Sequence, residues 1–350
     1  MMTLTKYLHT INFLKYTAAL ILVFAANIFF ITPSGASRTE DIRLSKQKGI
    51  AFLKYIQRSN GAICDTINPL FETWETIIAL SAIYRSDADT NTMVVKNGLS
   101  FLEKNENAEG LICHNKKCRQ AYCLETTAAY FKLLKLAGKN GNLRERLTRI
   151  AALQKPGGGW EIGNPHVNIE KDFPSVTAFV LNLFHDAGFE PDHKKEALNW
   201  LLKKQTVQGD WGKAWEYYGC SGYALWQVLE VLQHENSAEA RLAKERAIAF
   251  ILSNQNSDGS WFYKDPSIEK QTSAALQTAL MLLALQHAGE TNTAAVLKGI
   301  QYLVSSQQKQ GNWNGGYFPI PEKRYSKEEY VFATALATDV MQTYLLNNSH

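Results

Sequence analysis

The hydrophobic pattern of the chain alternates between two kinds of predicted helix. Six segments place apolar side chains on one face only, as at Ile248 and Phe250, with Gly or Ala where a neighbouring backbone must come close. Each is followed by a segment that is apolar on most faces, which is typical of a buried helix. These buried segments are 73–83, 126–136, 176–184, 222–232, 274–285 and 331–346. The alternation predicts six helical hairpins, each with an outer amphipathic helix and an inner buried one.

A seven-residue phrase, Gln-x-x-x-Gly-x-Trp, follows each amphipathic segment. Four intact copies begin at Gln154, Gln205, Gln255 and Gln307, and two variants with Ile in the Trp place begin at Gln57 and Glu106. The starting positions are 48 to 52 residues apart, and a fixed period of this size is typical of stacked or ringed units. The glycine can take a positive φ just past the last turn, so it predicts where the outer helix ends.

This phrase, preceded by a small residue and an aromatic one on the same helix, resembles the repeat of the squalene-hopene and oxidosqualene cyclases and of the related protein prenyltransferase β subunits. The resemblance runs from about Lys48 to the C-terminus. It implies an all-α fold, an (α/α)6 toroid, in which Trp stacks on Gln and each loop ties one outer helix to the next. It does not carry an activity, because one fold hosts many functions.

Composition supports a single globular domain over residues 48–350. The chain has 350 residues, 45% of them hydrophobic, which is ample for one core built from six repeats. It is too short to hold the second α-domain of the squalene cyclases. The formal net charge is only +4, and Lys6 and Lys15 supply part of it, so nucleic acid is not an expected partner. No phosphate-binding loop or other cofactor motif is present, and we expect no cofactor.

The N-terminus reads as a targeting segment over residues 1–36. Lys6 and Lys15 precede an apolar run over 17–31, and small residues follow up to Ala36. The segment is either a cleaved signal peptide or an uncleaved anchor that associates with the membrane through 17–31. Both predict a toroid outside the cytoplasm, either exported to the periplasm or medium or held on the membrane. Residues 37–47 form a polar lead-in to the first outer helix.

Export permits disulfides, and four of the five cysteines belong to the first two repeats. Cys64, Cys113, Cys118 and Cys123 allow three pairings, which the sequence leaves open. A metal site from Cys113, His114, Cys118 and Cys123 is the competing interpretation. Its spacing is not that of a paired Cys-x2-Cys zinc knuckle, so we expect disulfides and no metal. The fifth, Cys220, is expected as a buried apolar residue at the head of an inner helix.

The same loop carries a short basic cluster, which is either an anion site or a solvated surface. Its members are His114, Lys116, Lys117 and Arg119.

Two carboxylates are candidate catalytic acids. In the third repeat, the stretch from Asp172 to Ala178 stands where the cyclases carry Asp-x-Asp-Asp-Thr-Ala, but only the Thr-Ala end and one carboxylate survive. In the cyclases an aspartic acid kept protonated by its neighbours protonates an alkene or epoxide. Asp172 is either the remnant of that acid or an N-cap of the inner helix. Glu125, at the start of another inner helix, is the other carboxylate expected to reach the centre.

Aromatic side chains gather between the turns and the inner helices, and we expect them to bind substrate. In a cyclase such rings stabilise carbocations, in a carbohydrate enzyme they stack on sugars, and as core they simply pack. The candidate substrate-binding residues are Trp74, His166, Phe173, Trp215, Tyr217, Tyr218 and Tyr317.

The function that these features predict is a terpenoid-cyclase-like protein that binds an isoprenoid or similar apolar ligand in a central aromatic funnel. Whether it is an enzyme is left open; if it is, acid-catalysed cyclisation as an isomerase or lyase is the expected chemistry. One alternative is a secreted polysaccharide lyase or hydrolase on an (α/α)6 toroid, with a carbohydrate ligand. Another is a non-catalytic binding or scaffold protein.

The small residues before Ser37 generate a prediction about processing. We expect the exported protein to begin at or near Ser37, because signal peptidase cleaves after small residues. N-terminal sequencing of the secreted product tests this. A mature chain that begins at Met1 would identify the segment as an anchor instead.

Overall fold

The computed structural model describes residues 35–65, 71–86, 92–118, 120–139, 141–163, 173–212, 219–263, 271–318 and 327–348. Backbone contacts divide the chain into two compact units, Met1–Asp41 and Ile42–His350, and the second holds the repeats. The predicted apolar run 17–31 lies outside the described residues. Among the residues that are described, no helix is both long and apolar enough to cross a membrane.

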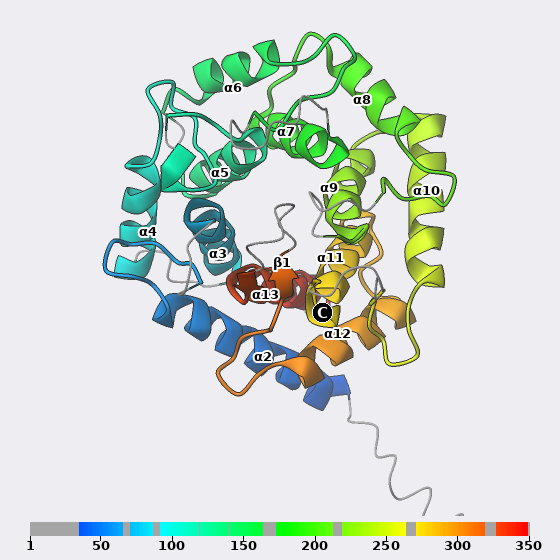
Figure 1. The fold of residues 1–350 in the computed structure, drawn as a ribbon. Coiled ribbons are helices and arrows are strands. Elements are labelled where there is room, and N and C mark those ends of the chain that lie inside the picture. The colour runs from blue at the N-terminus through cyan, green and yellow to red at the C-terminus, as the bar shows by residue number, and fades with distance from the viewer. Residues whose placement is uncertain are drawn as a thin grey trace, which may run out of the picture. The chain divides into compact units, whose positions relative to one another are not determined.

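Helices of the described residues alternate between an outer and an inner layer around one centre (Figure 1). The outer helices are α2 (Gly35–Tyr55), α4 (Met93–Glu103), α6 (Leu143–Ala152), α8 (Lys194–Lys203), α10 (Ala238–Ser253) and α12 (Ala294–Ser306). The inner helices are α3 (Glu72–Ser86), α5 (Leu124–Leu136), α7 (Pro174–Ala187), α9 (Gly222–Gln233), α11 (Ala274–His287) and α13 (Val331–Asn347). Each inner helix packs against the next, and α13 packs against α3 to close the ring. The predicted (α/α)6 toroid is confirmed.

Little else in the described chain has regular structure. A 3-10 turn, η1, covers Lys116–Cys118, and strands β1 (Gly316–Phe318) and β2 (Lys327–Glu329) form an antiparallel ribbon with Gly316 opposite Glu329. Helix α2 starts at Gly35, so the expected polar lead-in over 37–47 is part of the first helix. Its polar composition suits an outer helix, which needs only one apolar stripe.

The glutamine of each intact phrase links its own turn to the next outer helix. The amide Nε2 of Gln255 donates to the carbonyl of Gly259 at 3.0 Å and to that of Ala295, the second residue of α12, at 2.9 Å. The same pair of bonds recurs in four other repeats. In the last repeat, Gln307 reaches Ser45 of α2 at 2.9 Å, so one bond of the series joins the end of the ring to its beginning.

The variant second repeat makes the same connection with an ion pair. Glu106 accepts hydrogen bonds from Arg146 of the next outer helix, α6, at 3.0 and 3.2 Å, and from the hydroxyl of Tyr130 at 2.7 Å. A carboxylate cannot donate to carbonyl oxygens as an amide does. The change from Gln to Glu is therefore matched by a cation on the neighbouring helix.

The phrase glycine and tryptophan fix how closely successive outer helices approach. Gly259 has φ 95°, and a Cβ there would lie 2.5 Å from the carbonyl oxygen of Lys298 on α12. The Trp261 ring is buried, and its indole N–H donates to the carbonyl of Ile251 at 2.7 Å. A Cβ on Gly299 would come within 2.6 Å of that ring. Gly299 of α12 and Gly49 of α2 therefore make room for the tryptophan of the preceding repeat, Trp261 and Trp313 respectively.

Truncation of a phrase tryptophan should be costly. Trp261→Ala removes a fully packed ring and leaves a cavity between α10 and α12, so we expect unfolding to become easier by about 3–5 kcal/mol. Urea denaturation followed by circular dichroism measures the change. Val207→Ala, in the exposed turn of the preceding repeat, is the matched control and should change stability by less than about 0.5 kcal/mol. A loss below about 1 kcal/mol for Trp261→Ala would contradict this account of the turn.

Candidate functional site

The first turns of the inner helices bring a cluster of five aromatic rings together. Neighbouring ring centroids lie 5.5 to 6.4 Å apart in edge or tilted arrangements, which are the favoured geometries for aromatic pairs. All five rings are buried. The cluster comes from four inner helices: Trp74 of α3, Phe179 of α7, Tyr223 and Trp226 of α9, and Phe332 of α13. The five rings form one apolar, π-rich group that is shared by helices on different sides of the ring.

Glu125 meets this cluster through Tyr223. It is the second residue of α5, and Ser175 and Tyr223 are the second residues of α7 and α9. The Ser175 hydroxyl donates to Glu125 Oε1 at 3.3 Å, and Tyr223 also donates to the carboxylate. Burial raises the pKa of Glu125 to about 7, although these two hydrogen bonds favour the charged form and oppose the shift. A carboxyl group with this pKa is substantially protonated at neutral pH.

Three further carboxylates crowd together beside the aromatic cluster. Asp65, Glu75 and Glu329 are all buried, and one oxygen of each lies within 4.8 Å of the others. The backbone N–H of Asp65 donates to Glu75 Oε2 at 2.8 Å, and that of Tyr330 donates to Asp65 Oδ2 at 3.2 Å. Glu75 directly follows Trp74 in α3, so the acidic group and the aromatic cluster both include a residue from the start of that helix.

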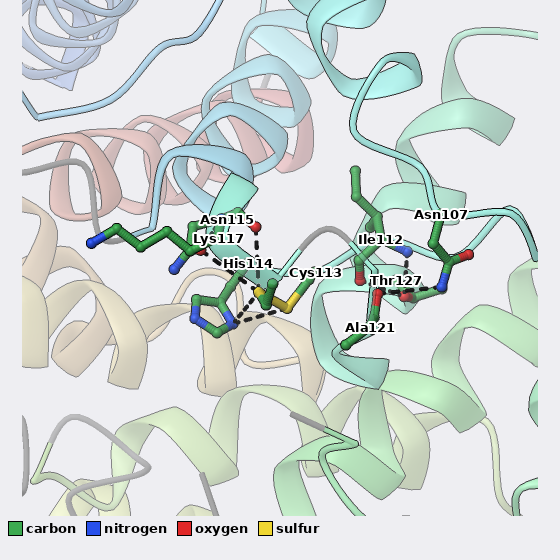
Figure 2. Close-up of a disulfide and its surroundings, with 9 residues drawn as sticks. Asn107, Ile112, Cys113, His114, Asn115, Lys117, Ala121 and Thr127 are labelled. Carbon is green, nitrogen blue, oxygen red and sulfur yellow. Dashed lines mark hydrogen bonds between the residues drawn. A yellow bond between two sulfur atoms is a disulfide. The ribbon is translucent and has the colours of Figure 1, made fainter. Parts of the chain in front are cut away.

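A cysteine-rich loop covers the start of α3 (Figure 2). The Sγ atoms of Cys113 and Cys118 lie at disulfide distance, 2.00 Å, one of the pairings that the sequence left open. The carbonyl of His114 accepts the backbone N–H groups of Thr73 and Trp74, at 3.1 and 3.2 Å. These are among the first N–H groups of α3, which have no partner inside the helix. The loop therefore caps the helix that carries Trp74.

The other cysteines are buried, whereas the described lysine side chain of the basic cluster is exposed. Cys123 packs with Cys113 and Cys118 in one buried group, and burial raises its pKa to about 12. Cys64 and Cys220 are buried, as expected for Cys220. The side chain of Lys117 is exposed, while those of Lys116 and Arg119 lie outside the described residues. The described part of this cluster shows no converging cations.

The C-terminal ends of the inner helices are joined by charged side chains. Lys132 pairs with Glu230 at 2.6 Å and with Asp186 at 3.1 Å, and His287 approaches Glu230 at 3.7 Å. Arg85 of α3 pairs with Asp339 of α13. Burial opposes ionisation of Glu230, but Lys132, with His287 and Arg85, outweighs it and lowers the pKa of Glu230 to about 2. The pKa of Glu125 is therefore raised at the aromatic end of the toroid, and the pKa of Glu230 is lowered at the charged end.

The predicted site residues fall into three groups. Trp74 belongs to the aromatic cluster, and Glu125 is hydrogen-bonded beside it. Phe173 is buried as the N-cap residue of α7, and Tyr317 is half-buried in β1, where its N–H donates to the carbonyl of Gln271 at 2.9 Å. The remaining predicted residues lie outside the described part of the chain: Asp172, His166, Trp215, Tyr217 and Tyr218.

Sequence reasoning missed several residues that the structure brings to the centre. Phe179, Tyr223, Trp226 and Phe332 belong to helices that are apolar on most faces, where an aromatic ring reads as core. Their position in the first two turns of the inner helices was the sequence feature that could have indicated a place near the site. The grouping of Asp65 with Glu75 and Glu329 joins the first repeat to the last, and only the closure of the ring reveals it.

Comparisons with known proteins confirm the resemblance to terpene cyclases. Residues 164–327 match the model of the squalene-hopene cyclase C-terminal domain. A squalene–hopene cyclase from Zymomonas mobilis is 34% identical over 152 residues, which cover 41% of this chain and 23% of that protein. The chain therefore spans less than a quarter of the length of such relatives.

Solved structures agree with the fold. A type II terpene cyclase from Scytonema, in complex with geranylgeranyl dihydroxybenzoate as substrate, has a TM-score of 0.71 at 16% identity and covers 88% of this chain and 98% of its own. A Klebsiella pneumoniae protein described as a possible member of the GH105 family has a TM-score of 0.59 at 15% identity, covering 90% and 94%. Both likenesses concern the fold.

The charged end of the toroid generates a prediction about stability and pH. The Lys132 and Glu230 side chains are 22% and 19% exposed. Breaking an exposed ion pair costs up to about 1 kcal/mol of unfolding free energy, and breaking a buried one costs about 3–5 kcal/mol. We expect the loss in Lys132→Met to lie between these values. The folded-state pKa of Glu230 is below its ordinary value of 4.5, so its stabilisation is complete above that pH and is lost as pH falls through about 2.

Urea denaturation of wild type and Lys132→Met between pH 7 and pH about 2 measures this, and the difference should shrink below pH about 4.5. Lys139→Met, which breaks an exposed pair with Glu103, is the control and should cost less than about 1 kcal/mol. An equal loss in both variants, or a difference that does not change with pH, would refute the coupling.

Proposed function

We propose that this terpene-cyclase-like chain binds an isoprenoid polyene against the aromatic cluster and cyclises it by protonation, with Glu125 as the acid. The observation that carries the proposal is the position of Glu125. Its carboxyl group has a pKa of about 7 and is hydrogen-bonded to Tyr223, whose ring belongs to the cluster. A general acid works best when its pKa lies near the operating pH.

The chemistry requires a proton donor next to a surface that tolerates positive charge. The protonated Glu125 carboxyl gives its proton to one carbon of an alkene, leaving a carbocation on the other carbon and a carboxylate on Glu125. Aromatic faces attract cations most strongly where water is excluded, and the five rings of the cluster are buried. Loss of a proton from the cyclised cation to a base completes the reaction, and a proton from solvent restores Glu125.

The substrate class follows from the apolar character of the cluster. A group of aromatic rings suits a polyprene chain. The Scytonema structure was solved with geranylgeranyl dihydroxybenzoate, which supports testing a prenylated aromatic acid beside squalene and geranylgeranyl diphosphate. Export or membrane attachment is part of the same proposal, supported by the two lysines and the apolar run over 17–31.

Turnover of these three compounds, followed by mass spectrometry of the products, tests the proposal. We expect a cyclised product from at least one compound with the wild-type protein and none with Glu125→Gln, because an amide has no acidic proton to give. The rate should fall as pH rises through about 7, where Glu125 loses its proton. Ser175→Ala removes a hydrogen bond that favours the charged carboxylate, so it should move this fall to higher pH.

Glu239→Gln is the matched control, since Glu239 is an exposed glutamate in the first turn of the outer helix α10, and its activity should equal wild type. Glu75→Gln separates the two acidic groups of the site. If Glu75→Gln abolishes turnover while Glu125→Gln retains it, the acid is the Asp65 group and the assignment of Glu125 is wrong. Absence of product from all three compounds would contradict cyclase activity and favour a binding role.

A further inference from the structure

We propose that the cysteine loop holds a Zn²⁺ ion when its disulfide is reduced, with Cys113, Cys118 and His114 as ligands and Cys123 as the fourth. This inference is independent of the proposed cyclase activity. It concerns the loop that caps α3, shown in Figure 2, and it rests on three side chains, Cys113, His114 and Cys118, whose ligand atoms lie within 4.8 Å of one another, with Cys123 packed against the two cysteines.

The imidazole faces both sulfurs. His114 Nδ1 lies 3.5 Å from Cys113 Sγ and 3.8 Å from Cys118 Sγ. In a tetrahedral zinc site, Zn–S bonds of about 2.3 Å and Zn–N bonds of about 2.0–2.1 Å set neighbouring ligand atoms about 3.5–3.8 Å apart. The two sulfur-to-nitrogen distances therefore already match two edges of such a site. Only the two sulfur atoms must move apart to reach this geometry, and reduction of the disulfide allows that.

Local hydrogen bonds from backbone N–H groups hold the ligands together. The N–H of Lys117 donates to Asn115 Oδ1 at 2.8 Å, within the turn that brings Cys118 back towards Cys113. The N–H of Cys123 donates to the carbonyl of Ile112 at 3.0 Å, which places Cys123 beside the same pair. All three cysteines are buried together. These bonds explain why a spacing unlike that of a zinc knuckle can still bring the ligands together.

The donor set selects the metal. Two or three thiolates and one imidazole suit Zn²⁺, whereas Ca²⁺ and Mg²⁺ take oxygen ligands. The ring of Phe71 lies against His114, with centroids 5.4 Å apart, and helps to fix the imidazole plane.

Reduction and oxidation of the Cys113–Cys118 bond interconvert the disulfide state and the zinc-bound state. A dithiol reductant gives two electrons and two protons to the Cys113–Cys118 bond, which becomes two thiols while the reductant becomes a disulfide. Binding of Zn²⁺ then releases the protons of the ligating thiols, and the metal keeps its charge of +2. An oxidant that re-forms the disulfide expels the metal. Because the His114 carbonyl caps α3 beside Trp74, either state ties this loop to the start of that helix.

Metal content of the full chain, measured after oxidation and after reduction with a phosphine that does not compete for zinc, tests the proposal. We expect the reduced protein to bind one Zn²⁺ per chain and the oxidised protein to bind none. His114→Gln keeps the cysteines and should weaken zinc binding at least about tenfold, since losing a ligand costs no less than losing a residue that supports one. Cys220→Ser removes a buried cysteine outside the loop and should bind zinc as wild type does.

Co²⁺ in place of Zn²⁺ gives a second readout, because thiolate coordination produces an absorption band that oxygen ligands do not. If a variant fails to fold, alkylation of the reduced wild-type protein decides the question: zinc should protect Cys113 and Cys118, as mapped by mass spectrometry. The proposal is overturned if reduced wild type binds no zinc, if His114→Gln binds it equally well, or if zinc gives these two cysteines no protection.

Discussion

The repeat glutamine makes the interaction on which the ring depends. In five of the six repeats its side-chain amide donates to the carbonyl of its own turn and to a carbonyl on or just before the next outer helix, so these hairpins are fixed to their neighbours by two bonds from one group. Between Gln307 and Ser45 the same bond spans the two ends of the repeat array. A glycine with positive φ lets the helices approach closely enough for these bonds to form. With the outer ring fixed in this way, the inner helices all begin at one end of the toroid.

Because the inner helices begin at the same end of the toroid, their first residues meet there and form a site. Glu125, Ser175 and Tyr223 are each the second residue of their helix, and they meet although Ser175 lies 50 residues and Tyr223 98 residues after Glu125 in the chain. The two ends of the toroid shift the pKa of a buried carboxyl group in opposite directions. Burial raises the pKa of Glu125 to about 7, whereas Lys132 overcomes the burial of Glu230 and lowers its pKa to about 2. The same residue type is thus an acid at one end and a structural anion at the other.

The sequence predicted the architecture well because the repeat is local. The helix order, the positive φ of the phrase glycines and the place of Trp74 and Glu125 all follow from periodicity and chain order. The partners of those residues depend on which helices face each other across the ring, and periodicity carries no such information. Trp226 and Phe332 therefore read as ordinary core, and Asp65 gave no sign of its approach to Glu329. In the cysteine loop, spacing argued against a metal site, while the turn around Asn115 brings His114 to both sulfurs.

The central claim is that this fold raises the pKa of Glu125 to about 7, so that a large share of its carboxyl groups carries a proton near neutral pH. Carbon NMR of the protein labelled at glutamate side-chain carboxyls measures it directly, with the Glu125 signal assigned from its absence in Glu125→Gln. The account predicts a signal that titrates with a pKa of about 7. A pKa at the ordinary value of 4.5 would show that the carboxylate is solvated and charged, and would contradict its role as an acid.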